Sequence, residues 1–272
     1  GVRDGPAVAR HLYAFAMGLL VWLCHTSAWG VLGLVIAGLE YVRRTSLRGF
    51  VGNMLPWASP IIPMMVWRVT KGSGVLFEKW LPMEKIYGIP NLLRAEWQIF
   101  DNASITLLLM ATLWLHWDKR FTRNAGLRLA ALALLVTALV LPALVLSSYF
   151  ADVRLYAPML MVALLAISGL PKREAALVGL AGAALFLLRI GETSIGWMTR
   201  GAEMEADLKA LDRVPMGARI AVLAHSSECG VWPLAGRNHA PSLAIVRRHA
   251  FVNTEWDIPG QHLMKPIYND VH

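Results

Sequence analysis

The chain is poor in the features that identify soluble enzymes. Only 16% of its 272 residues are charged, and it has just two cysteines. Cys24 lies within an apolar run and Cys229 in the polar C-terminal part, so no disulfide framework is indicated. The sequence lacks the motifs G-x-G-x-x-G, G-x-x-x-x-G-K-[ST], G-x-S-x-G and H-E-x-x-H. These absences argue against the enzyme classes that the motifs identify.

Metal and nucleic-acid sites are equally poorly supported. His225, Cys229 and His239 have no standard metal-ligand spacing, so we interpret them as surface-loop residues and identify no metal or other cofactor. The net charge of +8 lies in residues 1–197, where 18 Lys/Arg face 10 Asp/Glu, while residues 198–272 have eight of each. A basic excess confined to an apolar region is not typical of a nucleic-acid partner, and we expect none.

Apolar residues are abundant instead. Hydrophobic side chains make up 56% of the chain, and tryptophan, which is enriched at membrane interfaces, occurs 11 times. Six apolar stretches lie between about Leu12 and Trp197. The sequence therefore predicts a mainly α protein, a polytopic transmembrane helical bundle of about six spans that has the lipid bilayer as a partner. The stretches are residues 12–39, 50–67, 102–117, 129–148, 155–170 and 175–197.

Two of these stretches depart from a simple span. Residues 12–39 exceed the roughly 20 residues that a straight span needs, which leaves one tilted helix or a helix broken near His25. The next stretch contains Pro56, Pro60 and Pro63, and each proline removes an amide donor. We expect this second stretch to be kinked or partly unwound.

The charges of the loops predict the topology. Loops after the first, third and fifth stretches hold nine Lys/Arg against three Asp/Glu, a net of +6, whereas the other side of residues 1–197 has a net of +2. Basic loops are retained in the cytoplasm. We therefore predict that loop 68–101 and the C-terminal tail are external, and periplasmic if the membrane is a bacterial inner membrane.

The tail has the pattern of a folded segment. Residues 201–215 have apolar positions at helical spacing, and residues 217–225 and 242–252 have the β-branched and aliphatic content of strands. We therefore divide the chain into a transmembrane region, 1–197, and an external α/β subdomain, 198–272.

Two residues of the membrane region attract attention. His25 lies inside an apolar run, where an ionisable group is a functional candidate; the alternative is a neutral imidazole bonded between helices. Arg154 ends an external turn, where its planar guanidinium can hold a phosphate at headgroup depth. Its alternative roles are an ion pair with Asp152 or an anchor in the interface.

The segment D-x-R-L-Y-A-P-M-L, Asp152 to Leu160, resembles the R-Y-x-x-P type turn of the GT-C class of polytopic membrane glycosyltransferases. The resemblance implies a polyprenyl-phosphate-linked sugar as donor and a glycan, lipid or protein as acceptor on the external face. It also implies a catalytic base in the first external loop, which we expect upstream of Gly1. The residues that we predict to bind substrate are Arg154, Tyr156, Lys79, Lys85, Arg94 and His25.

We thus expect an inner-membrane glycosyltransferase of the cell envelope. Two alternatives stay open. The proline-rich stretch and His25 are compatible with a transporter or flippase. A non-catalytic subunit for envelope assembly is the third hypothesis.

Overall fold

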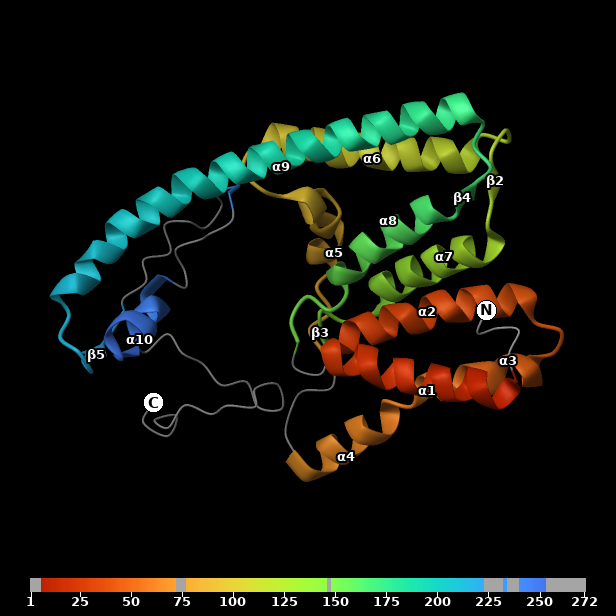
Figure 1. Ribbon diagram of the computed structural model, residues 1–272, viewed down its shortest axis with the longest axis horizontal. Coiled ribbons are helices and arrows are strands. Elements are labelled where there is room, and N and C mark those ends of the chain that lie inside the picture. Colours follow the sequence, from red (N-terminus) through yellow and green to blue (C-terminus); the bar gives the residue numbers. More distant parts are fainter. Residues whose placement is uncertain (1–5, 72–76, 146–147, 223–231, 234–239, 253–272) are drawn as a thin grey trace. The chain divides into compact units, whose positions relative to one another are not determined.

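The computed structural model describes residues 6–71, 77–145, 148–222, 232–233 and 240–252, and in these ranges the chain is mainly helical (Figure 1). It divides into two compact units. The first combines Gly1–Leu92 with Leu108–Pro171, and the second combines Leu93–Leu107 with Lys172–Ile258.

The first apolar stretch forms two helices, α1 (Ala7–Cys24) and α2 (Thr26–Arg43), which lie side by side (Figure 1). His25 between them is fully extended, with φ −167° and ψ 123°, and this interrupts the helical path. Of the two alternatives for this stretch, the broken helix is therefore the one observed. The first unit thus begins with a helical hairpin whose turn is at His25.

The prolines interrupt the second stretch as expected. Helix α3 (Leu47–Met54) passes into the 3-10 helix η2 (Leu55–Ala58), and α4 (Ile61–Lys71) follows after a turn. Pro56 lies at the start of η2, where its missing amide hydrogen costs no helical hydrogen bond. The stretch is therefore a series of short helices and not a regular span.

The core of the first unit lies where α7 (Ala125–Val140) packs between α2 and α8 (Tyr156–Leu165). A Cβ atom on Gly38 of α2 would lie 2.6 Å from the backbone oxygen of Gly126 in α7. The two helices can approach this closely because glycine occupies both positions. Buried Ala130, Leu134 and Tyr156 complete the contact.

The first unit also contains short strands and short helices. Strand β1 (Phe77–Glu78) pairs antiparallel with β3 (Leu144–Val145), and β2 (Thr122–Arg123) pairs antiparallel with β4 (Ile167–Ser168). The expected external loop 68–101 also contains helix α5 (Pro82–Gly88) and the 3-10 helix η3 (Pro90–Leu93), while η4 (Val153–Leu155) precedes α8.

Among the residues that the structure describes, three helices are long and apolar enough to cross a membrane. These are α1, α6 (Gln98–Trp117) and the helical segment Lys172–Arg213. Helix α8 has ten residues, half of the roughly 20 that a span requires. The chain is thus a mainly helical protein with three candidate spans, and the expected number of six remains a prediction.

In the second unit, α9 (Lys172–Leu208) continues into the 3-10 helix η5 (Lys209–Arg213). The proposed boundary between residues 197 and 198 lies inside this helix. Beyond it, β5 (Arg219–Ile220) pairs parallel with β6 (Phe251–Val252), and Ala244, Ala250 and Val252 form a small core. The α/β subdomain itself stays a prediction.

One expected strand was wrong over most of its length. Residues 242–252 form helix α10 (Leu243–Arg248), and only Phe251 and Val252 are in a strand. The helix buries Ala244 completely in the small core and ends at His249, which takes a left-handed conformation with φ 49°. Local β propensity is overridden here by tertiary packing.

Candidate functional site

The turn at residues 148–156 is held by loops from distant parts of the first unit. The Ala143 amide donates to the Lys79 carbonyl at 2.9 Å, and the Ala151 amide donates to the Ala143 carbonyl at 3.0 Å. Lys79 and Phe150 both have left-handed backbone, with φ 58° and 59°. Such conformations are costly for residues other than glycine and are concentrated at functional sites.

Beneath the turn, Lys85 and Asp152 form a buried ion pair. The Lys85 Nζ lies 2.6 Å from the Asp152 Oδ2, and the two side chains are 5% and 0% exposed. The same ammonium group donates to the carbonyls of Ala138 at 2.8 Å and Leu141 at 2.6 Å. All three ammonium hydrogens therefore have acceptors within the protein. In this arrangement Lys85 supports the turn and has no donor left for a substrate phosphate.

Tyr156 has a similar supporting position. Its side chain is 1% exposed, and its hydroxyl donates to the Lys85 carbonyl at 3.1 Å. A Cβ atom on Gly88 would lie 2.8 Å from the Tyr156 ring, so α5 approaches the start of α8 closely. Tyr156 thus links α5 to the turn that carries Arg154.

Arg154 is the residue of this turn that reaches an open groove. Asp152 is already occupied by Lys85, and the Arg154 Nη1 instead donates to the Ser148 hydroxyl at 3.2 Å. The alternative in which Arg154 pairs with Asp152 is therefore not observed. The guanidinium keeps its positive charge unneutralised by any carboxylate contact among the described residues.

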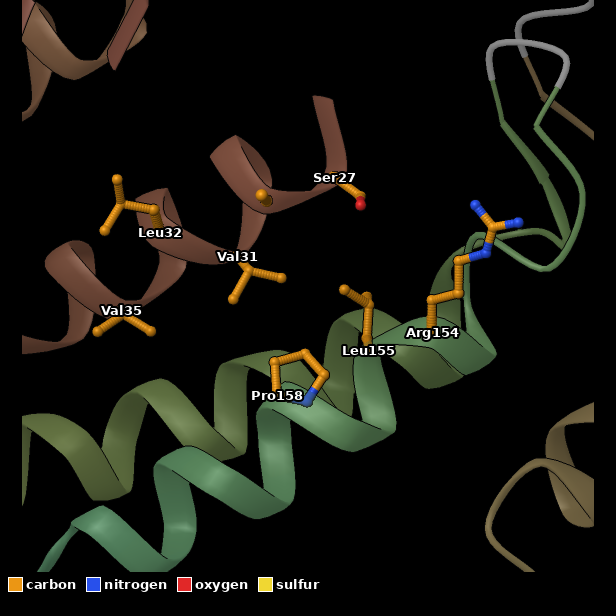
Figure 2. Close-up of a pocket in the computed structure, with 8 residues that line it drawn as sticks. Ser27, Val31, Leu32, Val35, Arg154, Leu155 and Pro158 are labelled. Atoms are coloured by element: carbon orange, nitrogen blue, oxygen red, sulfur yellow. The ribbon is translucent and has the colours of Figure 1, made fainter. Parts of the chain in front are cut away.

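The groove, of about 400 Å³, lies between α2 and the η4–α8 segment. Figure 2 shows Ser27 and Arg154 toward one end, while Val31 and Val35 line α2 and Leu155 and Pro158 face them. The cavity thus has a polar end and an apolar wall. Its lining residues are Ser27, Ala28, Val31, Leu32, Val35, Arg154, Leu155 and Pro158.

His25 is next to the polar end of the groove. Its Nδ1 accepts a hydrogen bond from the Ser27 amide at 3.2 Å and lies 2.9 Å from the Ser27 hydroxyl. The imidazole therefore caps α2 and orients a hydroxyl that lines the groove. The side chain is exposed, and its hydrogen bonds are to Ser27 in the first turn of α2.

Lys79 presents a second cation beside the same turn. Its Nζ lies 2.6 Å from the Tyr149 hydroxyl and 5.2 Å from the centre of that ring. The hydrogen bond to Tyr149 raises the pKa of Lys79 above its ordinary value of 10.5. Because the partner is a hydroxyl group, Lys79 is oriented but keeps its charge. Lys79 and Arg154 are thus fixed by the adjacent residues Tyr149 and Ser148.

Arg94 belongs to the second unit. Its Nε donates to the Trp232 carbonyl at 2.6 Å, and its guanidinium lies over the Trp232 ring at 5.4 Å. It is thus tied to the C-terminal part, and its expected contact with substrate stays a prediction.

The second unit also has a charge cluster that sequence reasoning missed. Asp101, fully buried, pairs with Arg189 and accepts from the Trp232 indole at 2.7 Å. Glu192 accepts from the backbone amides of Glu96 at 2.9 Å and Trp97 at 3.1 Å. Arg189 is therefore paired within this cluster. The sequence signal was available, since Arg189 and Glu192 are three residues apart within an apolar stretch.

No group of three or more His, Cys, Asp or Glu side chains that could hold a metal occurs within the described ranges. His225, Cys229 and His239 lie outside these ranges. Comparisons with protein families, with curated proteins and with solved structures found no match to this chain. The functional argument therefore rests on the geometry of the groove.

Proposed function

We propose that this chain is a membrane glycosyltransferase-like protein of the bacterial inner membrane. It takes a sugar from a polyprenyl-phosphate donor and passes it to an envelope glycan, lipid or protein on the external face. The observation that carries this proposal is the groove with Arg154 at its polar end and Val31, Val35 and Pro158 along its wall. This division matches an amphiphile with a phosphate headgroup and a hydrocarbon chain.

The polar end of the groove supplies the interactions that a phosphate group needs. A guanidinium presents several donors in a planar fork, and a hydrogen bond to a charged group contributes about 1.5–3 kcal/mol. Ser27 adds a hydroxyl that His25 orients, and Lys79 adds a second positive charge near the turn. Lys85 and Tyr156 contribute indirectly, because they hold the turn that bears Arg154.

The apolar wall supplies the complementary half of the site. Val31 and Val35 lie one turn apart on α2 with Leu32 beside them, and Leu155 and Pro158 lie opposite. Removing apolar chain from water contributes about 0.8 kcal/mol for each buried CH₂ group. A lipid-linked donor would thus be held by its chain and its phosphate together.

Sugar transfer by membranes that contain the full protein tests the proposal. Arg154→Lys keeps the charge and loses the fork, so we expect donor use to fall by about one decade, and Arg154→Ala should reduce it further. Arg173→Lys, at an exposed position in the second unit, is the matched control and should behave as the parent protein. Normal transfer by both Arg154 variants, at equal protein amount, would contradict the proposal.

A second function is favoured by one observation, the interrupted helices at His25 and at residues 55–60. Discontinuous helices line the substrate sites of many transporters, so the groove could move a lipid-linked sugar across the membrane. The two functions differ in their product. Transfer releases the sugar from the donor, whereas transport delivers the intact donor to the other leaflet of proteoliposomes.

A further inference from the structure

The end of the first unit opposite the groove gathers two basic loops. The close approach of Gly38 and Gly126 places the end of α2 beside the start of α7. Helix α3 and the pair β2–β4 lie at this same end (Figure 1). Residues distant in the sequence, 40–54 and 118–128, thus form one surface, which we call the basic end.

The basic end is strongly positive. It has seven Lys/Arg and two carboxylates, Glu40 and Asp118. Both carboxylates are engaged, since Glu40 accepts from the Asn53 amide at 2.9 Å and Asp118 accepts from Arg120. The hydrogen bonds from Arg120 lower the pKa of Asp118, so this carboxylate stays ionised. The cations are Arg43, Arg44, Arg48, Lys119, Arg120, Arg123 and Arg128.

Four of these cations are exposed and have no hydrogen bond or ion pair within the part of the chain that the structure describes. They are Arg43, Arg48, Lys119 and Arg128. By contrast, Arg44 donates to the Tyr41 carbonyl at 2.8 Å, and Arg123 donates to the Leu115 carbonyl at 3.1 Å. The free cations are the ones able to bind an external anion.

Helix α3 adds an apolar stripe to this surface. Leu47 and Val51 of α3 and Leu55, the first residue of η2, recur every four residues and are 67%, 54% and 70% exposed. Helix α3 is also held to α2, because Phe50 packs edge-to-face on Tyr41 with ring centres 5.8 Å apart. Exposed leucine and valine beside arginine are typical of a helix that lies in a membrane interface.

We propose that the basic end binds anionic phospholipid headgroups, with the α3 stripe inserted among the lipid chains. The four free cations complement the negative surface of an anionic leaflet, and the exposed apolar stripe beside them can enter its acyl region. A soluble acidic protein would leave the stripe in water. This inference is independent of the proposed glycosyltransferase function.

The full chain, reconstituted in bilayers of phosphatidylcholine with a minor fraction of phosphatidylglycerol, provides the test. Spin-labelled forms of each lipid report their relative association with the protein. We expect a preference for phosphatidylglycerol that weakens with salt and falls by roughly threefold or more in Arg43→Gln/Arg48→Gln. The control Lys209→Gln/Arg213→Gln removes equal charge from exposed residues of the second unit and should keep the preference.

Two outcomes would overturn the inference. One is equal association of the two lipids with the parent protein. The other is an equal loss in the double variant and in its control, which would mean that only total charge matters. The variant Val51→Ser, which keeps every cation, should also weaken the preference, and an unchanged preference would exclude insertion of the stripe. Equal thermal unfolding midpoints confirm that the variants are folded.

Discussion

At the scale of single residues, the basic side chains near the groove differ in the chemical groups that they contact. Lys85 faces a carboxylate and two carbonyls and is buried, whereas Lys79 and Arg154 face hydroxyl groups. A carboxylate neutralises a cation, while a hydroxyl group only orients it. Three residues that looked equivalent in the sequence thus divide into one that stabilises the turn and two that remain available to an anion.

The buried pair predicts a large effect on stability. Lys85→Met leaves the buried Asp152 carboxyl group without its main partner, which should lower the free energy of unfolding by about 3–5 kcal/mol. The double variant Lys85→Met/Asp152→Leu removes both charges and should recover most of this loss. Lys119→Met, at an exposed position, is the control. Thermal unfolding in detergent measures all three, and a double variant no better than Lys85→Met would contradict the pairing.

Lys79 predicts a pH effect with a defined sign. Its folded-state pKa is raised, so the stabilisation is complete below its ordinary pKa of 10.5 and is lost as the pH rises through the folded value. Since only the neutral amine reacts with acetic anhydride, Tyr149→Phe should speed acetylation of Lys79 at mildly alkaline pH. The rate at Lys119 should stay constant, and mass spectrometry of peptides measures both. An unchanged Lys79 rate would mean that Tyr149 does not hold the ammonium.

At the scale of elements, α2 organises the first unit. It packs on α7 through Gly38 and Gly126, and its N-terminal half lines the groove. Close contact of two helix backbones demands glycine at the crossing, because any side chain there would meet the neighbouring helix. The position of the groove wall relative to Arg154 therefore depends on this crossing.

Two glycine substitutions in α2 test this crossing, one at the contact with α7 and one away from it. Gly38→Ala should destabilise the protein by about 1–3 kcal/mol, since the added Cβ would lie 2.6 Å from the Gly126 oxygen and α2 would have to move. Gly33→Ala is on the same helix and meets nothing within 4 Å, so it should be neutral or stabilise by up to about 1 kcal/mol. Thermal unfolding compares the two. Equal effects of both changes would exclude the close crossing.

The breaks in the helices could be predicted from the sequence, and some other features could not. Three prolines in eight residues and an excess of length around His25 indicated interruptions, and both occur. Residues 242–252 have a strand-like composition, but burial of Ala244 selects a helix. Asp101 and Glu192 were missed because Asp101 pairs with Arg189 and Glu192 accepts from the amides of Glu96 and Trp97, and these contacts join residues that are far apart in the sequence.

At the scale of the molecule, the loops of the first unit lie in two groups at its opposite ends. Ser27, Arg154 and Lys79 belong to one end, and Arg43, with the other basic loops, to the opposite end. Helix α2 joins them, and its 18 residues span about 27 Å at 1.5 Å per residue. This length is close to the hydrocarbon thickness of a bilayer, about 30 Å. Loop charge had placed the basic loops opposite loop 68–101, whereas Ser27 was expected inside the first apolar stretch.

Labelling from outside the cell tests which end faces which compartment. Cysteines placed at Ser46 and Thr122, in the basic loops, should resist a membrane-impermeant thiol reagent in intact cells and react after lysis. A cysteine at Ser242, in the tail, should react in intact cells. The background variant Cys24→Ala/Cys229→Ala without a new cysteine is the control. Labelling of the two basic loops in intact cells would reverse the proposed topology.

The central claim is that the groove holds a lipid phosphate through Arg154 and its chain along α2. Equilibrium binding of polyprenyl phosphate and of uncharged polyprenol to the purified full chain in nanodiscs tests it most directly. Arg154→Ala should weaken binding of the phosphate by about one to two decades and leave polyprenol binding unchanged. Val31→Trp, which fills the groove, should weaken binding of both. The account is contradicted if Arg154→Ala binds polyprenyl phosphate as tightly as the parent protein while remaining folded.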